Sequence, residues 1–364
     1  MTELARGRTT VLVTGTNGKT TTTAMLARAL TEQGTVASNS SGANMPEGLV
    51  AALAADPDAG FGVLEVDEAH LPAVLAATGP AMVVLLNLSR DQMDRTGEVR
   101  RTERALREAL SRYPSVTVVA NCDDPLVTSA AAATRHPVWV SAGAVWQADA
   151  AACPRCGDLV HDRFGQWWCR CGLARPRPDW TLERHGIRTP EGRHLPLAVG
   201  VPGPANLGNA AMATAAAVTL GAPLVPSLHR IGSISDVAGR YRVVDYRDRR
   251  ARLLLAKNPA GWREILTVLS DHISPVVIAI NAREADGRDP SWLWDVPFGR
   301  LAGRQVIASG ERAVDLAVRL AYADVAHVVV PDPVAAITHV PRGAVDVVSN
   351  YTAFQDLTRT LRHA

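Results

Sequence analysis

The feature that most constrains the fold is a strand, a tight glycine-rich turn and a helix start that follow one another within residues 11–20. The turn reads Thr-Gly-Thr-Asn-Gly-Lys-Thr, and its glycines let the backbone curl so that amide groups point at phosphate oxygens. Lys19 can reach the β- and γ-phosphates of a nucleotide, and the Thr20 hydroxyl can ligate Mg²⁺. The pattern therefore predicts an ATP-binding loop made of Gly15, Thr16, Asn17, Gly18, Lys19, Thr20 and Thr21.

Apolar β-like runs alternate with helical stretches through most of the chain. The runs expected to be buried strands are 11–13, 63–64, 82–86, 116–119, 253–255, 276–280, 306–307, 328–330 and 345–348. Apolar residues at helical spacing predict helices over 20–33 and 206–220. This alternation indicates α/β domains with mostly parallel sheets. A length of 364 residues predicts two domains, a P-loop domain over 1–225 and a Rossmann-like α/β domain over 226–364.

Four of the five cysteines cluster in an insertion, residues 148–179, that is rich in Gly, Pro, Arg and Trp and too poor in aliphatic residues to build a core alone. A Cys-x-x-Cys knuckle and a Cys-x-Cys pair are formed by Cys153, Cys156, Cys169 and Cys171. Four thiolates complete a closed tetrahedral site, so the spacing predicts one structural Zn²⁺, whose binding supplies on the order of 10 kcal/mol of folding energy. Two disulfides are the alternative. Cys122 is expected to be a small buried residue and not a nucleophile.

Composition excludes several classes of protein. Lys plus Arg exceed Asp plus Glu by only two, 38 against 36, so bulk charge gives no reason to expect binding to nucleic acid. The start of the chain lacks the apolar segment of a signal peptide, and no run of about 18 uncharged apolar residues predicts a transmembrane segment. Clustered cysteines suit a reducing cytosol and a metal site. We therefore expect a cytoplasmic globular enzyme.

The phosphate loop is a variant, because Val13 stands where the common pattern has its first glycine. This variant resembles the loop of the Mur ligases and folylpolyglutamate synthases. Glu65 ends a buried strand, at the edge where an open α/β sheet presents ligands, and the resemblance implies that it helps to hold Mg²⁺. Residues 121–125 resemble the family's Asn-x-Asp-Asp-Pro turn, and Asn206 with Asn209 its Asn-x-x-Asn helix start beside the nucleotide. Caps and turns are the alternative for these polar residues.

Within the Mur ligases, passages in order along the chain resemble the MurT family, the ligase subunits of lipid II isoglutaminyl synthase. They are residues 41–45, residues 87–95, the four-cysteine ribbon, and residues 256–261 and 285–292. Gln92 replaces the metal-associated histidine of most Mur ligases. Ten residues precede Val11, where classical Mur ligases have a domain for the UDP part of their substrate, so we expect a lipid-linked substrate.

The resemblance implies an amidation that consumes ATP and glutamine. ATP phosphorylates the D-glutamate α-carboxylate of the lipid II stem peptide, and ammonia attacks the acyl phosphate to give D-isoglutamine. Lys19 and Mg²⁺ neutralise charge during phosphoryl transfer. The chain shows no Cys–His pair of the glutaminase kind, so a GatD-type glutamine amidotransferase is expected as partner in a heterodimer, at the inner face of the membrane.

Asp289 is expected to complete the partner's triad, because the resemblance matches it to an aspartate that orients the glutaminase histidine. From the residues alone it is a loop acid before Pro290, and a turn or helix cap is the alternative.

Three rival functions stay open: a folylpolyglutamate-type ligase that adds glutamate, a zinc-ribbon NTPase that binds nucleic acid, and a scaffold that binds ATP without catalysis.

Overall fold

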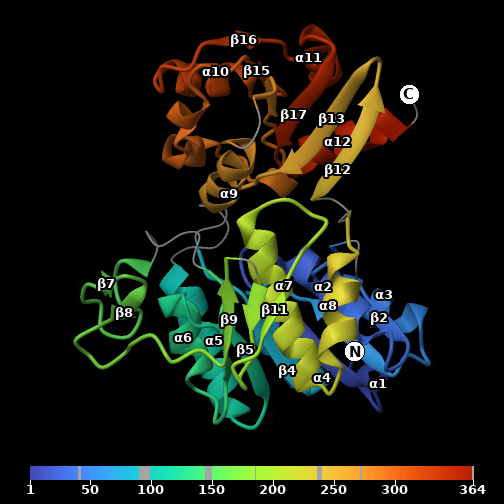
Figure 1. Ribbon diagram of the computed structural model, residues 1–364, viewed down its shortest axis with the longest axis vertical. Helices are drawn as coiled ribbons and strands as arrows, with labels where there is room; N and C mark the ends of the chain where they lie inside the picture. Colours follow the sequence, from blue (N-terminus) through green and yellow to red (C-terminus); the bar gives the residue numbers. More distant parts are fainter. Residues whose placement is uncertain are drawn as a thin grey trace. The chain divides into compact units, whose positions relative to one another are not determined.

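The computed structural model describes residues 1–39, 42–89, 99–143, 150–184, 186–235, 240–270 and 273–362. The chain divides into two compact units, and the first ends at Ser235. This end lies ten residues beyond the expected 225, because α8 (Leu224–Gly232) packs on α2 and α7 of the first unit. Figure 1 shows these three helices side by side.

The first unit is built on a nine-stranded sheet in the order β11-β10-β9-β6-β5-β4-β1-β3-β2. Neighbours from β2 to β9 pair in parallel, and β10 and β11 continue the sheet antiparallel. The strands are β1 (Thr9–Thr14), β2 (Val36–Ser38), β3 (Phe61–Glu65), β4 (Met82–Leu85), β5 (Thr117–Asn121), β6 (Val138–Ser141), β9 (Trp180–Glu183), β10 (Gly186–Arg188) and β11 (His194–Pro196). The central strands are the ones that the apolar runs predict.

Helices cover both faces of this sheet, because alternate residues of each buried strand point to opposite sides. Leu12 of β1 and Leu64 of β3 belong to a core that α3, α4, α5 and α6 close. The other face is covered by α2 and α7, which pack together with α8. The helices are α1 (Thr2–Ala5), α2 (Lys19–Leu30), α3 (Pro46–Ala55), α4 (Leu71–Thr78), α5 (Val99–Arg112), α6 (Pro125–Ala131) and α7 (Pro204–Thr219).

Proline or a side-chain cap begins several of these helices. Proline opens α3, α6 and α7, where its missing N–H costs no hydrogen bond. Asp124 caps α6 by accepting from the backbone N–H groups of Leu126 and Val127. Both α2 and α7, the helices expected over 20–33 and 206–220, are confirmed.

The cysteine segment leaves the large sheet after β6 and returns to it at β9. It forms a hairpin of its own, β7 (His161–Arg163) and β8 (Gln166–Trp168), which pair antiparallel. The expected insertion is therefore a separate small sheet (Figure 1).

The second unit contains a six-stranded sheet in the order β12-β13-β17-β14-β15-β16, parallel except for β12. The strands are β12 (Tyr241–Tyr246), β13 (Arg249–Leu255), β14 (Val276–Ala279), β15 (Val306–Ser309), β16 (His327–Val329) and β17 (Gly343–Ser349). The helices are α9 (Pro259–Ser270), η2 (Glu284–Asp286), η3 (Ser291–Asp295), η4 (Phe298–Leu301), α10 (Ala313–Ala321), α11 (Pro333–His339) and α12 (Tyr351–Arg362).

Two cores flank this second sheet. On one side Trp262 of α9 meets Phe298 edge to face, with ring centroids 5.0 Å apart. On the other side α11 and α12 bury Ile337 and Phe354 against the strands. A mostly parallel sheet with helices on both faces confirms the expected Rossmann-like domain.

Candidate functional site

The phosphate loop connects β1 to α2 at the carboxyl edge of the first sheet. Gly15 has a φ of +136° and Gly18 a φ of +85°, both in the range that favours glycine. A side chain at Gly15 would meet the backbone of Asn87, and one at Gly18 the side chain of Asn209. Both glycines are therefore required by the backbone angles and by close neighbours.

The loop is held by the segment that follows β4. Asn87 accepts from the backbone N–H of Thr16 through its main-chain oxygen (3.0 Å). Its side chain accepts from Asn17 N–H (2.9 Å) and donates to Asn17 O (2.9 Å). The Thr16 hydroxyl donates to Ser89 O and accepts from Ser89 N–H. Asn87 opens the MurT-like passage 87–95, of which residues 90–95, with Gln92, lie outside the described part of the chain.

Lys19 is buried at the first turn of α2, with 2% of its side chain exposed. Its ammonium donates to the carbonyl oxygens of Gly15 and Thr16 and forms an ion pair of 3.0 Å with Glu68. The ammonium thus lies within the loop, where it can exchange these partners for phosphate oxygens. Glu68 was not predicted as a site residue from the sequence, although it stands three residues after Glu65.

Glu65 ends β3 and is fully buried. Asn39 fixes its backbone with two hydrogen bonds of 2.8 Å. Asn44 donates to its Oε1 at 3.3 Å, whereas Oε2 is buried and accepts no hydrogen bond from the described residues. A buried carboxylate oxygen without a donor is a site for a cation, because such an atom otherwise costs free energy.

The Mg²⁺ expected at this edge therefore fits the residues present. The loop after β2 reaches both predicted ligands: Asn44 contacts Glu65, and the backbone at Gly42 faces the Thr20 hydroxyl. Ser41, the first residue of the passage 41–45, lies outside the described residues. Carboxylate and hydroxyl oxygens are the hard ligands that Mg²⁺ takes, together with phosphate oxygens and water.

Two further polar passages lie near the loop. Asn209, in the first turns of α7, borders Gly18 and donates to Asn206 Oδ1 at 3.2 Å. Asn206 itself donates to Pro202 O. Asp124 in the passage 121–125 caps α6 and also accepts from Leu88 N–H at 2.8 Å, so this turn braces the segment after β4.

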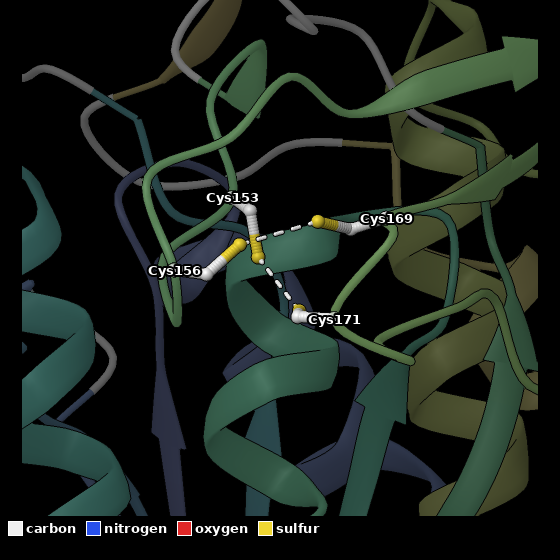
Figure 2. A group of neighbouring side chains, drawn as sticks. All are labelled: Cys153, Cys156, Cys169 and Cys171. Carbon is white, nitrogen blue, oxygen red and sulfur yellow. Dashed lines mark hydrogen bonds between the residues drawn. The ribbon is translucent and has the colours of Figure 1, made fainter.

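The four ribbon cysteines come together (Figure 2). Their sulfur atoms all lie within 4.8 Å of one another. Cys153 Sγ lies 3.6 Å from Cys171 Sγ, and Cys156 Sγ lies 3.4 Å from Cys169 Sγ. A Zn–S bond of about 2.3 Å places the sulfurs of a tetrahedron about 3.8 Å apart, whereas a disulfide requires about 2.05 Å. The donor set fits Zn²⁺, and none of the four forms a disulfide.

Several ribbon side chains bond to the rest of the first unit, among them Arg155, which donates to Ser129. Trp167 packs against Cys153 and Cys169 and donates from Nε1 to Cys122 O at 3.1 Å. Arg175 forms an ion pair of 2.6 Å with Asp123. Cys122 is fully buried, as expected, and burial raises the pKa of its thiol to about 12. None of these contacts was predicted from the sequence.

Asp289 belongs to the second unit, in the turn before η3. Its carboxylate is exposed and accepts from the backbone N–H (2.8 Å) and hydroxyl (2.9 Å) of Ser291. It therefore makes the turn contact that the residues alone suggest, and it also lines an open groove of about 350 Å³ with Trp294. Asp286 anchors the same turn, because it is buried and accepts from the backbone N–H and hydroxyl of Thr352.

Comparison with known proteins decides between the rival families. The family model of the Mur ligase middle domain matches residues 13–217, and that of the MurT ligase C-terminal domain matches residues 255–354. The chain belongs to the MurT family of Mur ligases. The MurT subunit of lipid II isoglutaminyl synthase from Staphylococcus aureus strain COL is 30% identical to this MurT chain over 86% of it and 77% of the relative. The subunit from Streptococcus pneumoniae is 31% identical over 87% and 77%.

Solved structures show the same fold. A pseudomurein peptide ligase type C from Methanothermus fervidus superposes on 98% of the chain and 78% of its own length, with a TM-score of 0.77 and 18% identity. Among the described residues of this MurT protein, no helix has the length and apolar character needed to cross a bilayer.

Proposed function

We propose that this chain is the ligase subunit of a lipid II isoglutaminyl synthase that acts in peptidoglycan synthesis at the cytoplasmic face of the membrane. It amidates the D-glutamate α-carboxylate of the lipid II stem peptide to D-isoglutamine, with ATP and glutamine. The observation that carries the proposal is the presence, in one chain, of a Mur ligase middle domain and a MurT C-terminal domain. Relatives that align with 86% and 87% of the chain are named as the MurT subunit of lipid II isoglutaminyl synthase.

The first step is phosphoryl transfer at the loop of the first unit. A carboxylate oxygen attacks the γ-phosphorus, the bond to the bridging oxygen breaks, and ADP leaves. Lys19 exchanges Glu68 and the loop carbonyls for phosphate oxygens and neutralises the charge that develops there. Thr20 and Glu65 would hold Mg²⁺, which would supply further positive charge. Asn39 fixes the backbone of Glu65, and Asn87 holds the phosphate loop in position.

The second step is amide formation. Ammonia attacks the acyl carbon, phosphate leaves, and the nitrogen loses a proton. A glutaminase of the Cys–His kind requires a reactive cysteine, and the one cysteine outside the ribbon, Cys122, is buried with a pKa of about 12. We therefore assign glutamine hydrolysis to a GatD-type partner subunit. Asp289, exposed at the rim of its groove, orients the partner's histidine.

The test uses the chain co-purified with its glutaminase and assayed on lipid II with ATP. We expect Glu65→Ala to abolish amidation with glutamine and with a high concentration of ammonium salt, since it removes a metal ligand. Asp289→Asn abolishes only the glutamine-driven reaction. Glu284→Gln is the matched control and retains both activities, because Glu284 is an exposed acid of η2, close to Asp289 in the chain.

Two results would contradict the proposal. If the wild-type chain does not amidate lipid II with ammonium and ATP, the proposed reaction is wrong. If Asp289→Asn loses both activities equally, Asp289 does not serve the glutaminase. A folylpolyglutamate-type ligase would consume glutamate and require no second protein.

A further inference from the structure

The second unit carries a groove whose charged residues have no part in the proposed reaction. It lies at the amino ends of β13 and β17, beside β12 and the segment before β14, and has a volume of about 680 Å³. Arg250 and Arg252 of β13 line it, together with the apolar side chains of Val243 and Ile273. This volume is in the range of sites that hold small molecules.

The two arginines stand where one face of the second sheet changes from apolar to charged. Alternate residues of a strand share a face, so Leu254, Arg252 and Arg250 follow one another on the same side of β13. Leu254 belongs to the core beneath α9, whereas Arg252 and Arg250 continue the row into the groove. A guanidinium at the end of an apolar face is costly unless its charge and its donors are matched.

The donors of these arginines are largely unused. The Arg252 side chain is only 17% exposed, yet it donates from Nε alone, to Asp346 at 2.7 Å. A guanidinium has five N–H donors, and the buried Nη2 of Arg252 finds no acceptor among the described residues. Arg250 is exposed, and its side chain likewise bonds to none of them. Asp245 stands opposite Arg250 in the register of β12 and β13, but the two form no ion pair.

The charge of the groove is positive. Among the described residues that line it, Asp346 is the only acid, and it is buried. Its carboxylate is shared, because it accepts from Arg252 and from the Ser274 hydroxyl (3.2 Å) and also pairs with Arg304 at 3.5 Å. One carboxylate therefore serves two buried guanidinium groups, and the charge of Arg250 adds to the excess. A groove with excess positive charge and unused N–H donors is suited to an anion.

We propose that this groove binds an organic phosphate, with phosphate oxygens at Arg250 and Arg252 and the apolar part of the ligand against Val243 and Ile273. A phosphate fits better than a carboxylate, because it offers more oxygen atoms to two guanidinium forks and carries up to two charges. Ile273 is 95% exposed and Val243 39%, so apolar surface adjoins the charged wall. The phosphate could come from a lipid headgroup or from a soluble compound, and the experiment separates these sources. The inference does not depend on the proposed function.

Isothermal titration with pyrophosphate tests the groove. Because pyrophosphate also fits the phosphate loop, all variants are made in a full-length Lys19→Ala parent, in which binding at the loop is weakened equally for all. We expect Arg250→Ala to raise the Kd of pyrophosphate about tenfold, as the loss of a charge-assisted hydrogen bond does. Arg242→Ala is the matched control, since Arg242 precedes Val243 on β12 and therefore points to the opposite face; its Kd stays within about twofold of the parent.

Vesicle flotation identifies the source of the phosphate. If it is a lipid headgroup, the wild-type chain floats with vesicles that contain phosphatidylglycerol and not with vesicles of phosphatidylcholine alone, and both Arg250→Ala and Ile273→Ala weaken flotation. If it is a soluble organic phosphate, the protein binds pyrophosphate but neither kind of vesicle. Either result supports the groove as a phosphate site.

Two outcomes would overturn the phosphate site: Arg250→Ala binding pyrophosphate as tightly as its parent, or a wild-type chain that binds neither pyrophosphate nor vesicles. Arg250 is the decisive position because it is exposed, so its replacement leaves the fold intact, which thermal unfolding checks. Arg252→Ala is less informative, since it also leaves the buried Asp346 with less positive charge beside it.

Discussion

The ion pair between Lys19 and Glu68 gives the sharpest test of the phosphate loop. Both side chains are almost fully buried, 2% and 8% exposed, and their charged atoms lie 3.0 Å apart. Removing one partner of such a pair leaves an uncompensated charge, which costs about 3 to 5 kcal/mol in other proteins. Because two loop carbonyls still accept from Lys19 in a Glu68→Gln variant, we expect the low end, about 3 kcal/mol.

This cost should apply to the nucleotide-free protein only. Bound phosphates supply the negative charge that the variant lacks, so nucleotide binding recovers most of the loss. A difference of about 3 kcal/mol corresponds to roughly a hundredfold tighter binding of ATP. Isothermal titration measures the affinity, and thermal unfolding with and without ATP and magnesium measures the stabilisation, which should be larger in Glu68→Gln than in wild type.

Glu103→Gln is the control for this test. Glu103 is buried on α5 and pairs with Arg107 at 2.9 Å, but it has no part in the phosphate loop. Its loss should lower stability equally with and without nucleotide. If Glu68→Gln is as stable as wild type without nucleotide, or binds ATP no more tightly, Glu68 does not compete with phosphate for Lys19.

The remaining predictions concern the ribbon and the turn of the second unit. Metal analysis should find one zinc per chain, and a strong chelator or Cys169→Ser should lower the unfolding temperature; disulfides seen by mass spectrometry would contradict the zinc site. Cys122 should resist iodoacetamide at pH 8 in the folded protein, because its raised pKa of about 12 keeps the thiol protonated; rapid labelling seen by mass spectrometry would argue against that burial. Asp286→Ala should cost about 1 to 3 kcal/mol in unfolding free energy by leaving the Thr352 N–H unpaired, and should slow glutamine-driven amidation more than the ammonium-driven reaction, as rate assays would show.

Much of the fold follows from local patterns. The central strands of both sheets are continuous apolar runs, and the phosphate loop is short, so its turn and helix start are specified by adjacent residues. The candidate zinc ligands were predictable for the same reason, since the Cys-x-x-Cys knuckle and the Cys-x-Cys pair bring four thiolates together within one short segment.

What the sequence did not reveal depends on contacts between distant residues. The side chains of Asn39 and Asn87 bond to backbone atoms of Glu65 and Asn17. Although Asn87 opens the MurT-like passage 87–95, neither contact can be inferred from the neighbouring residues. The strands β9, β10 and β11 are only three or four residues long, and β12 is partly exposed along its length. Such segments lack an apolar run, and their strand character comes from pairing with a neighbour.

The place of the ribbon in the chain has a consequence for assembly. Because β6 and β9 are parallel neighbours, the chain must return from the carboxyl end of β6 to the amino end of β9. In α/β proteins a helix usually makes this connection. Here the segment with the four cysteines stands in place of such a helix, and residues 175–179 after it run back from a contact of Arg175 with Ser141 to one of Asp179 with Trp139. Zinc bound at the proposed four-cysteine site would therefore help to order the connection on which the pairing of β9 and the packing of α7 after it depend.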